Sequence, residues 1–130
     1  MNNVPLNTLS PGALGKHLIA DFCGASHLFD GEPAKAVLRK AAEAAGATVL
    51  DVNVHDFGDR FGFTGLALLA ESHISIHTWP ENGYVAIDIF MCGDADPSLS
   101  LAVLKDHFTP DKEQVQLLHR GSVAALTPAS

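Results

Sequence analysis

The chain has 130 residues, of which 47% are hydrophobic and 18% are charged, and its net charge is −7 at neutral pH. This length suits one domain with its own hydrophobic core, and no stretch approaches the roughly 20 apolar residues of a membrane-spanning helix. The 15 acidic residues outnumber the 8 basic ones, which argues against nucleic acid or anionic lipid as a partner, because phosphate binding needs clustered Lys and Arg.

The ends of the chain, 1–12 and 123–130, are predicted to be tails around a single domain at 13–122. The polar first segment carries no Lys or Arg and lacks the charged and apolar regions of a secretory signal, so we expect a cytoplasmic protein. The two cysteines, Cys23 and Cys92, are too few for a disulfide framework and do not have zinc-binding spacing.

The predicted elements follow the order β-α-β-β-β-β-α-β. Strands are expected at 16–22, 48–54, 66–70, 74–79, 84–90 and 115–119. A helix is expected over 34–45, since Pro33 suits a first helical position and Gly46 a helix end, and a second over 97–107. Three glycines predict a loop over 55–65. This order predicts an α+β fold, a two-layer sandwich with two helices on one face of a largely antiparallel sheet.

One stretch, residues 71–93, is too rich in reactive side chains for ordinary scaffolding. It reads ESHISIHTWPENGYVAIDIFMCG. Reactive or recognition side chains occupy eight of its positions: Ser72, His73, His77, Trp79, Glu81, Tyr84, Asp88 and Cys92. Buried strands usually avoid polar groups because each group must find a partner. We therefore expect a functional site in this stretch.

Two kinds of site are disfavoured by the spacing. His73 and His77 could bind a metal ion together with His55 or Asp88, but on one strand these two histidines lie about 13 Å apart, too far to share an ion. A Ser-His-Asp hydrolase is also disfavoured, since the chain has no GxSxG elbow and no evident oxyanion loop. No metal is expected.

The same stretch resembles a known family. ESHISIHTWPE followed by GYVAIDIFMCG is similar to the core motif of the bacterial S-adenosylmethionine decarboxylases. The resemblance extends to GKHLIADF, AGATVLDVNVHDF and FTG, and it covers roughly residues 15–120. It implies a self-processing enzyme with a covalent pyruvoyl cofactor, which decarboxylates S-adenosylmethionine to the aminopropyl donor for spermidine biosynthesis.

The resemblance also implies where the chain cuts itself. The bond is Glu71–Ser72, and its cleavage would give fragments 1–71 and a pyruvoyl-capped 72–130. The Ser72 hydroxyl would attack the Glu71 carbonyl, and loss of the α-hydrogen would then expel the Glu71 carboxylate. The dehydroalanine left behind would hydrolyse to the pyruvoyl group and ammonia.

Two further motif positions are implied to assist this processing. His77 holds the position of the base that accepts the proton, and imidazole gains and loses protons near neutral pH. Thr64 holds the position of a helper hydroxyl that is usually a serine. In a regular strand Ser72 and His77 would face opposite sides, so a bulge near His73 is predicted to bring them together.

After processing, the pyruvoyl ketone at Ser72 would form a Schiff base with the substrate amine and accept the electrons released with carbon dioxide. The family match makes Cys92 the donor of a proton to the product carbon. An ordinary thiol is mostly protonated at neutral pH, as this role requires.

Substrate binding is implied for Phe57, Trp79 and Glu81. Glu81 would hold the ribose hydroxyls, and Phe57 would stack on adenine, because an aromatic face suits a flat base or a cationic sulfonium. The loop after Phe57 has one extra residue, so Phe61 and Phe63 compete for the stacking role, although a core position is favoured for Phe63.

The family's active sites lie between two protomers, so a homodimer of cleaved chains is implied. One alternative is the same self-processing fold acting on arginine or ornithine. Another is a non-catalytic binding or regulatory domain that does not process. The presence of Ser72, His77 and Cys92 together argues against the latter, since a scaffold does not need all three.

Overall fold

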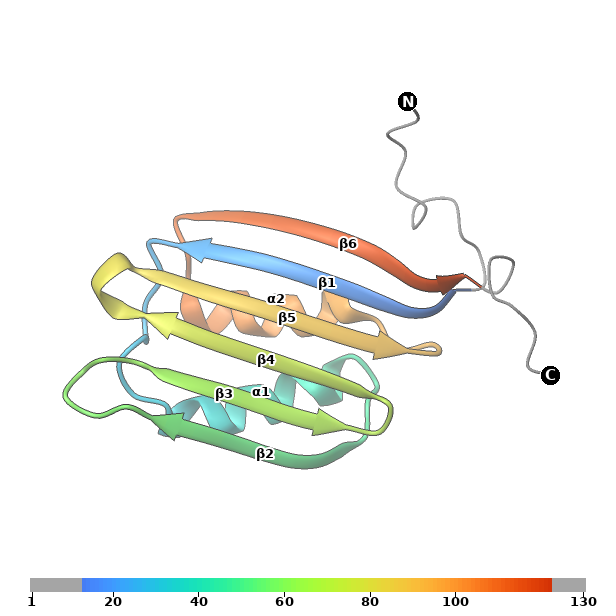
Figure 1. Ribbon diagram of the computed structural model, residues 1–130, viewed down its shortest axis with the longest axis horizontal. Helices are drawn as coiled ribbons and strands as arrows, with labels where there is room; N and C mark the ends of the chain where they lie inside the picture. The colour runs from blue at the N-terminus through green and yellow to red at the C-terminus, as the bar shows by residue number, and fades with distance from the viewer. Residues whose placement is uncertain (1–12, 123–130) are drawn as a thin grey trace.

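The structure is a computed structural model, and it describes residues 13–122 (Figure 1). The tails expected at 1–12 and 123–130 lie outside the described residues. The strands are β1 (Ala13–Cys23), β2 (Val49–Asp56), β3 (Phe63–Leu69), β4 (Ser72–Trp79), β5 (Tyr84–Cys92) and β6 (Lys112–Ser122). The helices are α1 (Glu32–Ala44) and α2 (Pro97–Phe108), and a short 3₁₀ turn spans Pro80–Asn82. None of the helices in this described part is long and apolar enough to cross a membrane.

The strands form one six-stranded sheet in the order β2-β3-β4-β5-β1-β6, and every neighbouring pair is antiparallel. Both helices lie behind the sheet in Figure 1, with α1 against β2 and β3 and α2 against β1 and β5. This arrangement confirms the predicted α+β sandwich with two helices on one face. Because β1 enters the sheet between β5 and β6, residues near the start of the chain lie beside the 71–93 stretch.

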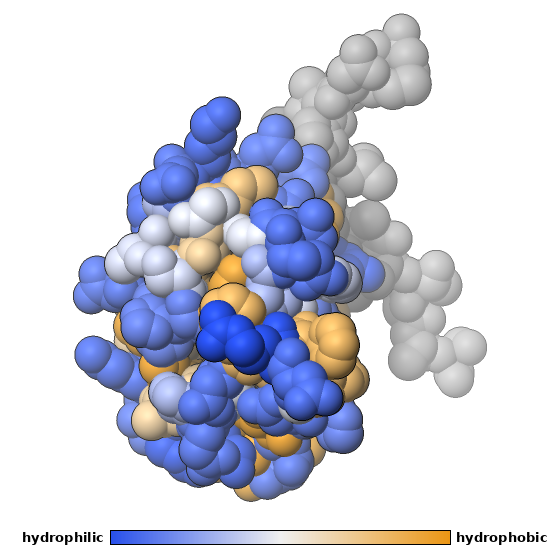
Figure 2. All heavy atoms as spheres, turned by 90° about the vertical axis from the view of Figure 1, so that its left-hand side faces the viewer, coloured by the Kyte–Doolittle hydropathy of each residue, from blue (hydrophilic) through white to orange (hydrophobic). Residues whose placement is uncertain are grey.

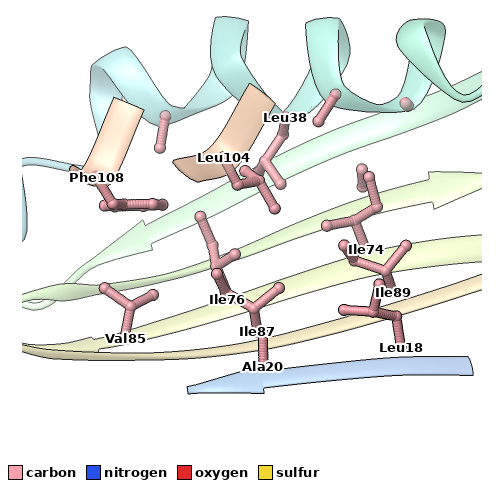
Figure 3. Packing of buried hydrophobic residues seen from close by; sticks show 14 of the residues in the cluster. Leu18, Ala20, Leu38, Ile74, Ile76, Val85, Ile87, Ile89, Leu104 and Phe108 are labelled. Atoms are coloured by element: carbon pink, nitrogen blue, oxygen red, sulfur yellow. The ribbon is translucent and has the colours of Figure 1, made fainter. Parts of the chain in front are cut away.

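The core fills the space between the sheet and the helices (Figure 3). Alternate residues of β4 and β5, such as Ile76 and Ile87, point toward Leu38 of α1 and toward Leu104 and Phe108 of α2. All five of these side chains are at most 2% exposed. Full burial of each contributes about 1.5–3 kcal/mol relative to exposure, so the period-two pattern of the strands fixes which face of the sheet meets the helices.

The other face of the sheet, which we call the open face, is covered by no helix or strand of residues 13–122 (Figure 1). It presents polar side chains together with large apolar ones. Four of the latter are 39–49% exposed: Ile19, Leu66, Leu68 and Trp79. The side chains at 73, 75, 77 and 79 all point to this face, since their neighbours at 72, 74, 76 and 78 are buried against the helices.

Two expectations from the sequence are wrong. The loop expected over 55–65 is shorter, because β2 continues to Asp56 and β3 begins at Phe63, whose fully buried ring belongs to the core. The bulge expected near His73 is absent from β4, which pairs with β3 and β5 without any shift of register. The irregularity of the described sheet lies instead in β2, between Val49 and Asp51.

Candidate active site

The hairpin turn between β3 and β4 holds a first group of residues, Glu71, Ser72 and Cys92, which we call the Ser72 cluster. Leu69 pairs with Ser72 across a two-residue turn, Ala70–Glu71. Glu71 has a φ of 61°, in the left-handed region that costs a residue with a side chain about 1–2 kcal/mol. The turn therefore carries strain at the residue that precedes Ser72.

Cys92 forms hydrogen bonds to both residues that the Glu71–Ser72 peptide bond joins. Its thiol donates a hydrogen bond to the Glu71 carbonyl oxygen at 2.9 Å, and its backbone N–H donates to Ser72 Oγ at 3.2 Å. Ser72 is 8% exposed, whereas Glu71 is exposed. A hollow of about 300 Å³ lies between the end of α1 and this cluster. Cys92 thus contacts both the Ser72 hydroxyl oxygen and the Glu71 carbonyl oxygen.

A second group, the His77 cluster, lies at the opposite end of the same strands and consists of Thr64, His77, Trp79 and Tyr84. Thr64 Oγ1 and His77 Nδ1 are hydrogen-bonded at 3.1 Å. The His77 ring lies 6.3 Å from the Trp79 ring, which stacks on Tyr84 at 5.3 Å. The Tyr84 hydroxyl donates to Asp21 at 2.5 Å, and this hydrogen bond to a carboxylate raises the pKa of Tyr84 to about 12.

The two clusters do not meet within one chain. Ser72 and His77 are five positions apart on a regular strand, so their backbones are about 16 Å apart. Ser72 points toward the helices, while His77 points to the open face. Rotation of side chains cannot bridge this separation. The structure therefore brings Ser72 together with Cys92, and His77 together with Thr64, but not Ser72 with His77.

The three candidate phenylalanines have different environments. Phe63 is fully buried in the core. Phe57 is 54% exposed and packs edge-to-face against His55 at 4.8 Å. Phe61 is 66% exposed and shares a hollow of about 320 Å³ with Glu81. This end of the molecule faces the viewer in Figure 2, where hydrophobic residues lie among hydrophilic ones. Phe57 and Phe61 are both accessible to a ligand, and Phe61 is the one that adjoins Glu81.

The β2–β3 loop that carries these aromatic rings is tied to the segment before α1. The Asp56 carboxylate accepts hydrogen bonds from the backbone N–H groups of Gly58 at 3.0 Å and Gly31 at 3.1 Å. These two bonds, that from Gly58 foremost, lower the pKa of Asp56. The Arg60 guanidinium lies 3.7 Å from the centre of the Phe29 ring, a cation–π contact. Asp56 and Arg60 thus both hold the loop against residues 29–31, the segment that precedes α1.

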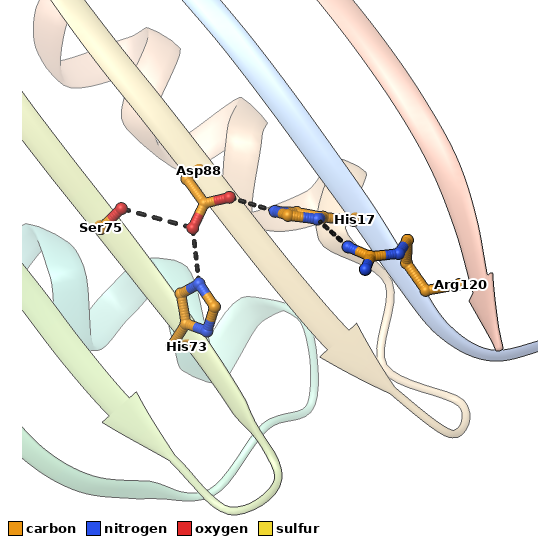
Figure 4. A network of polar contacts seen from close by, with 5 residues as sticks. All are labelled: His17, His73, Ser75, Asp88 and Arg120. Carbon is orange, nitrogen blue, oxygen red and sulfur yellow. Dashed lines mark hydrogen bonds and ion pairs between the residues drawn. The ribbon is translucent and has the colours of Figure 1, made fainter.

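A third group lies on the open face, and we call His17, His73, Asp88 and Arg120 the His–Asp network (Figure 4). The Asp88 carboxylate of β5 accepts from His17 Nε2 of β1 and from His73 Nε2 of β4, the latter at 2.5 Å. Arg120 of β6 donates to His17 Nδ1 at 2.9 Å, and Ser75 makes a longer contact of 3.4 Å to the same carboxylate. Burial raises the pKa of Asp88, but the hydrogen bonds from both histidines outweigh burial and lower it.

Three of these four side chains are the one group among residues 13–122 with the spacing to hold a metal ion. The ligand atoms of His17, His73 and Asp88 lie within 4.8 Å of one another. A metal on His17 Nε2 would require a proton on Nδ1, yet the Arg120 guanidinium donates to that atom. The contacts therefore favour a hydrogen-bonded network over a metal site.

The chain is similar to known proteins of one family over most of its length. A family model described as S-adenosylmethionine decarboxylase matches residues 16–121. The chain belongs to this family. The S-adenosylmethionine decarboxylase proenzyme of Parasynechococcus marenigrum is 44% identical over 116 residues, which make up 87% of this chain and 90% of that relative. The proenzyme of the same name from Methanococcus vannielii is 43% identical over 113 residues, 85% of this chain and 92% of the relative.

A solved structure of the S-adenosylmethionine decarboxylase family has the same fold. The crystal structure of the adenosylmethionine decarboxylase from Aquifex aeolicus aligns with a TM-score of 0.78 and 31% sequence identity, and it covers 92% of this chain and all of the other. The resemblance expected from the ESHISIHTWPE motif is therefore confirmed. The proenzyme relatives do not support an arginine or ornithine decarboxylase, or a non-catalytic domain.

Two sets of contacts in this site cannot be predicted from the sequence. The sequence offers His73 and Asp88 as possible metal ligands, but it gives no sign of His17 or Arg120. The proximity of His17, 71 positions earlier in the chain than Asp88, follows only from the place of β1 in the sheet. The bond between Tyr84 and Asp21, which also joins β5 to β1, depends on the same place of β1.

Proposed function

We propose that this chain is a proenzyme that cuts itself between Glu71 and Ser72 and then decarboxylates S-adenosylmethionine with the pyruvoyl group left at position 72. The cut would give fragments 1–71 and 72–130. The observation that supports this proposal most directly is the position of Cys92, whose thiol contacts the carbonyl to be attacked and whose backbone N–H contacts the attacking oxygen.

The first step is the addition of Ser72 Oγ to the carbonyl carbon of Glu71. Negative charge develops on the carbonyl oxygen, and the Cys92 S–H, at 2.9 Å, is placed to stabilise it. The amide nitrogen takes up a proton as the C–N bond breaks, which leaves an ester between Glu71 and the Ser72 oxygen. The strain of the left-handed Glu71 backbone is released when this peptide bond breaks.

The second step removes the α-hydrogen of residue 72 and expels the Glu71 carboxylate. The resulting dehydroalanine takes up water and loses ammonia, which yields the pyruvoyl group. His77 is the proposed base, and the Thr64 hydroxyl at 3.1 Å orients its imidazole. Because His77 cannot reach Ser72 of its own chain, the base must come from a second copy.

A homodimer packed through the open face meets this requirement. Four large apolar side chains on the open face are 39–49% exposed, as a surface that packs against another layer would be: Ile19, Leu66, Leu68 and Trp79. Under a two-fold axis, the Ala70–Glu71 turn of one chain would lie over the His77 end of the other at both ends of the sheet. The partner's imidazole would then approach the α-hydrogen of residue 72 at the turn, beside the exposed Glu71, and not the Ser72 Oγ that points toward the helices. Each of the two sites then draws residues from both copies.

In the decarboxylation itself, a pyruvoyl ketone condenses with the substrate amine and accepts the electron pair released with carbon dioxide. Cys92 adjoins position 72 and is the proposed proton donor to the product carbon. Glu81 is exposed and is the proposed partner of the ribose hydroxyls, with Phe57 as the adenine-stacking ring and Phe61 as its competitor. Trp79 completes the proposed binding surface.

A reducing compartment suits this chemistry. Cys23 and Cys92 are both free thiols, and Cys92 can donate a proton only while it is reduced. We therefore include a cytoplasmic location in the proposal.

Release of carbon dioxide from labelled substrates tests the proposed activity. The purified protein should release it from S-adenosylmethionine and not from arginine or ornithine. Ser72→Ala, which cannot form a pyruvoyl group, is the matched control and should release none. Release from arginine or ornithine would support the alternative substrates. A fully cut chain that acts on none of the three compounds would contradict the decarboxylase.

A further inference from the structure

The cut removes a covalent restraint from residue 72, the residue that would carry the pyruvoyl group. In the intact chain, Ser72 is held on its amino-terminal side by the covalent turn at Ala70–Glu71. After cleavage, β4 begins at position 72, and the group that must meet the substrate sits on a free chain end. Chain ends fray unless something ties them down. A misplacement of about 1 Å at a reacting group can cost roughly 100-fold in rate.

His73 is the first side chain after the cut, and it is anchored away from the turn. Its Nε2 donates to Asp88 Oδ2 at 2.5 Å. Its ring stacks on Phe90 with the two centres 6.0 Å apart and the planes 17° apart. Both partners belong to β5, a strand on the same side of the cut as β4. These contacts therefore remain when the link to Glu71 is lost.

The carboxylate that anchors His73 is itself held in place. Asp88 also accepts from His17 of β1, and His17 in turn accepts from Arg120 of β6. The contacts run from β4 through β5 and β1 to β6, across four neighbouring strands. Figure 4 shows Asp88 between the two imidazole rings, with Arg120 beyond His17. The carboxylate that His73 contacts is thus part of a network that spans four of the six strands.

We propose that the hydrogen bond from His73 to Asp88 fixes the new amino-terminal end of β4 after the chain is cut and so positions the pyruvoyl group for decarboxylation. This inference rests on the proposed function. It makes His73 a positioning residue, with His17 and Arg120 supporting the carboxylate that His73 contacts. The contact matters little for self-cleavage, since the covalent turn then holds Ser72.

The variant His73→Phe tests this role. It keeps a flat ring to stack on Phe90 and removes only the hydrogen bond to Asp88. In the cut protein, amide hydrogen exchange over residues 73–76 should become about fivefold faster. The kcat for decarboxylation should fall by about the same factor while KM changes little, because the proposed substrate contacts lie elsewhere. The half-time of self-cleavage should stay within about twofold of the wild type.

Matched variants separate positioning from a general loss of stability. Ser75→Ala removes only the long contact to the same carboxylate and should change neither exchange nor kcat. Asp88→Asn keeps an acceptor for one of the two imidazoles and should give a smaller effect of the same sign. In an uncut Ser72→Ala background, His73→Phe should leave the exchange of 73–76 unchanged.

Faster exchange of equal size in the cut and uncut proteins would overturn the inference, since His73 would then be an ordinary structural residue. Unchanged exchange in the cut variant would overturn it as well. A wild-type chain that cuts itself but decarboxylates nothing would contradict the proposed activity, while the exchange measurement would still decide whether His73 holds the new chain end. A chain that never cuts would overturn both.

Discussion

Pairing two defective chains tests whether each active site is shared between two copies. Ser72→Ala lacks the nucleophile, and His77→Ala lacks the proposed base, so neither chain should cut itself when made alone. In a mixed dimer, the His77→Ala chain keeps its own Ser72 and faces an intact His77 on its partner. We expect the His77→Ala chain to be cut only when the two are produced together.

The expected yield follows from the geometry of β4. Ser72 and His77 of one chain are about 16 Å apart and point to opposite faces of the sheet, so a site completed within one chain is excluded. If the two variants pair at random in equal amounts, about half of the dimers are mixed, and each has one complete site. About a quarter of all chains, or half of the His77→Ala chains, should therefore be cut.

Intact mass spectrometry of the co-expressed proteins gives this yield directly. The matched control replaces the Ser72→Ala partner with a chain that carries both substitutions, and this mixture should contain no cut chain. Cutting of His77→Ala alone would refute the assignment of the base. An uncut co-expressed mixture, in the presence of demonstrated mixed dimers, would refute the shared site.

Three further outcomes are expected. Phe63→Ala, in an uncut Ser72→Ala background, should lower the free energy of unfolding by about 3–5 kcal/mol, because it removes a fully buried aromatic ring from the core. Urea titrations measure this loss, and a loss below about 1 kcal/mol would contradict the placement of the ring. Cys92→Ser should still cut itself, since a hydroxyl can donate a hydrogen bond to the Glu71 carbonyl. The cut variant should decarboxylate about 100-fold more slowly, because a hydroxyl is a much weaker acid than a thiol. Steady-state kinetics on the cut protein measure this rate, and an unchanged kcat would exclude the proton-donor role. The pKa of Tyr84 in the folded protein, about 12, lies above the usual tyrosine value of 10.0. Its bond to Asp21 therefore stabilises the fold fully below pH 10, and this stabilisation is lost as the pH rises through 12. Tyr84→Phe should remove this part of the alkaline loss of stability, and identical pH profiles of the two proteins would contradict it.

Local sequence patterns predict the elements of this fold well, because their causes are local. Pro33 and Gly46 mark the two ends of α1 to within two residues. Proline suits the first turn of a helix, and glycine suits the left-handed backbone that follows the last turn. The strands predicted at 74–79 and 84–90 are confirmed as β4 and β5. Ile76 and Ile87 of these strands are buried against the helices.

The contacts between distant segments could not be predicted in this way. His17 meets Asp88 because β1 inserts between β5 and β6, and nothing in either segment specifies its neighbour. The bulge predicted near His73 is wrong for a different reason. It follows only if Ser72 and His77 meet within one chain, and the regular pairing of β4 keeps them apart. A base from a second copy, as proposed above, needs no bulge.

Intact mass spectrometry of the purified protein, beside a Ser72→Ala control, tests the central claim most directly. We expect two fragments divided between Glu71 and Ser72, the second lighter by one ammonia than a product of simple hydrolysis, and an uncut control. A single unmodified chain of 13.7 kDa after long incubation would contradict the self-processing account and the decarboxylase activity that depends on it.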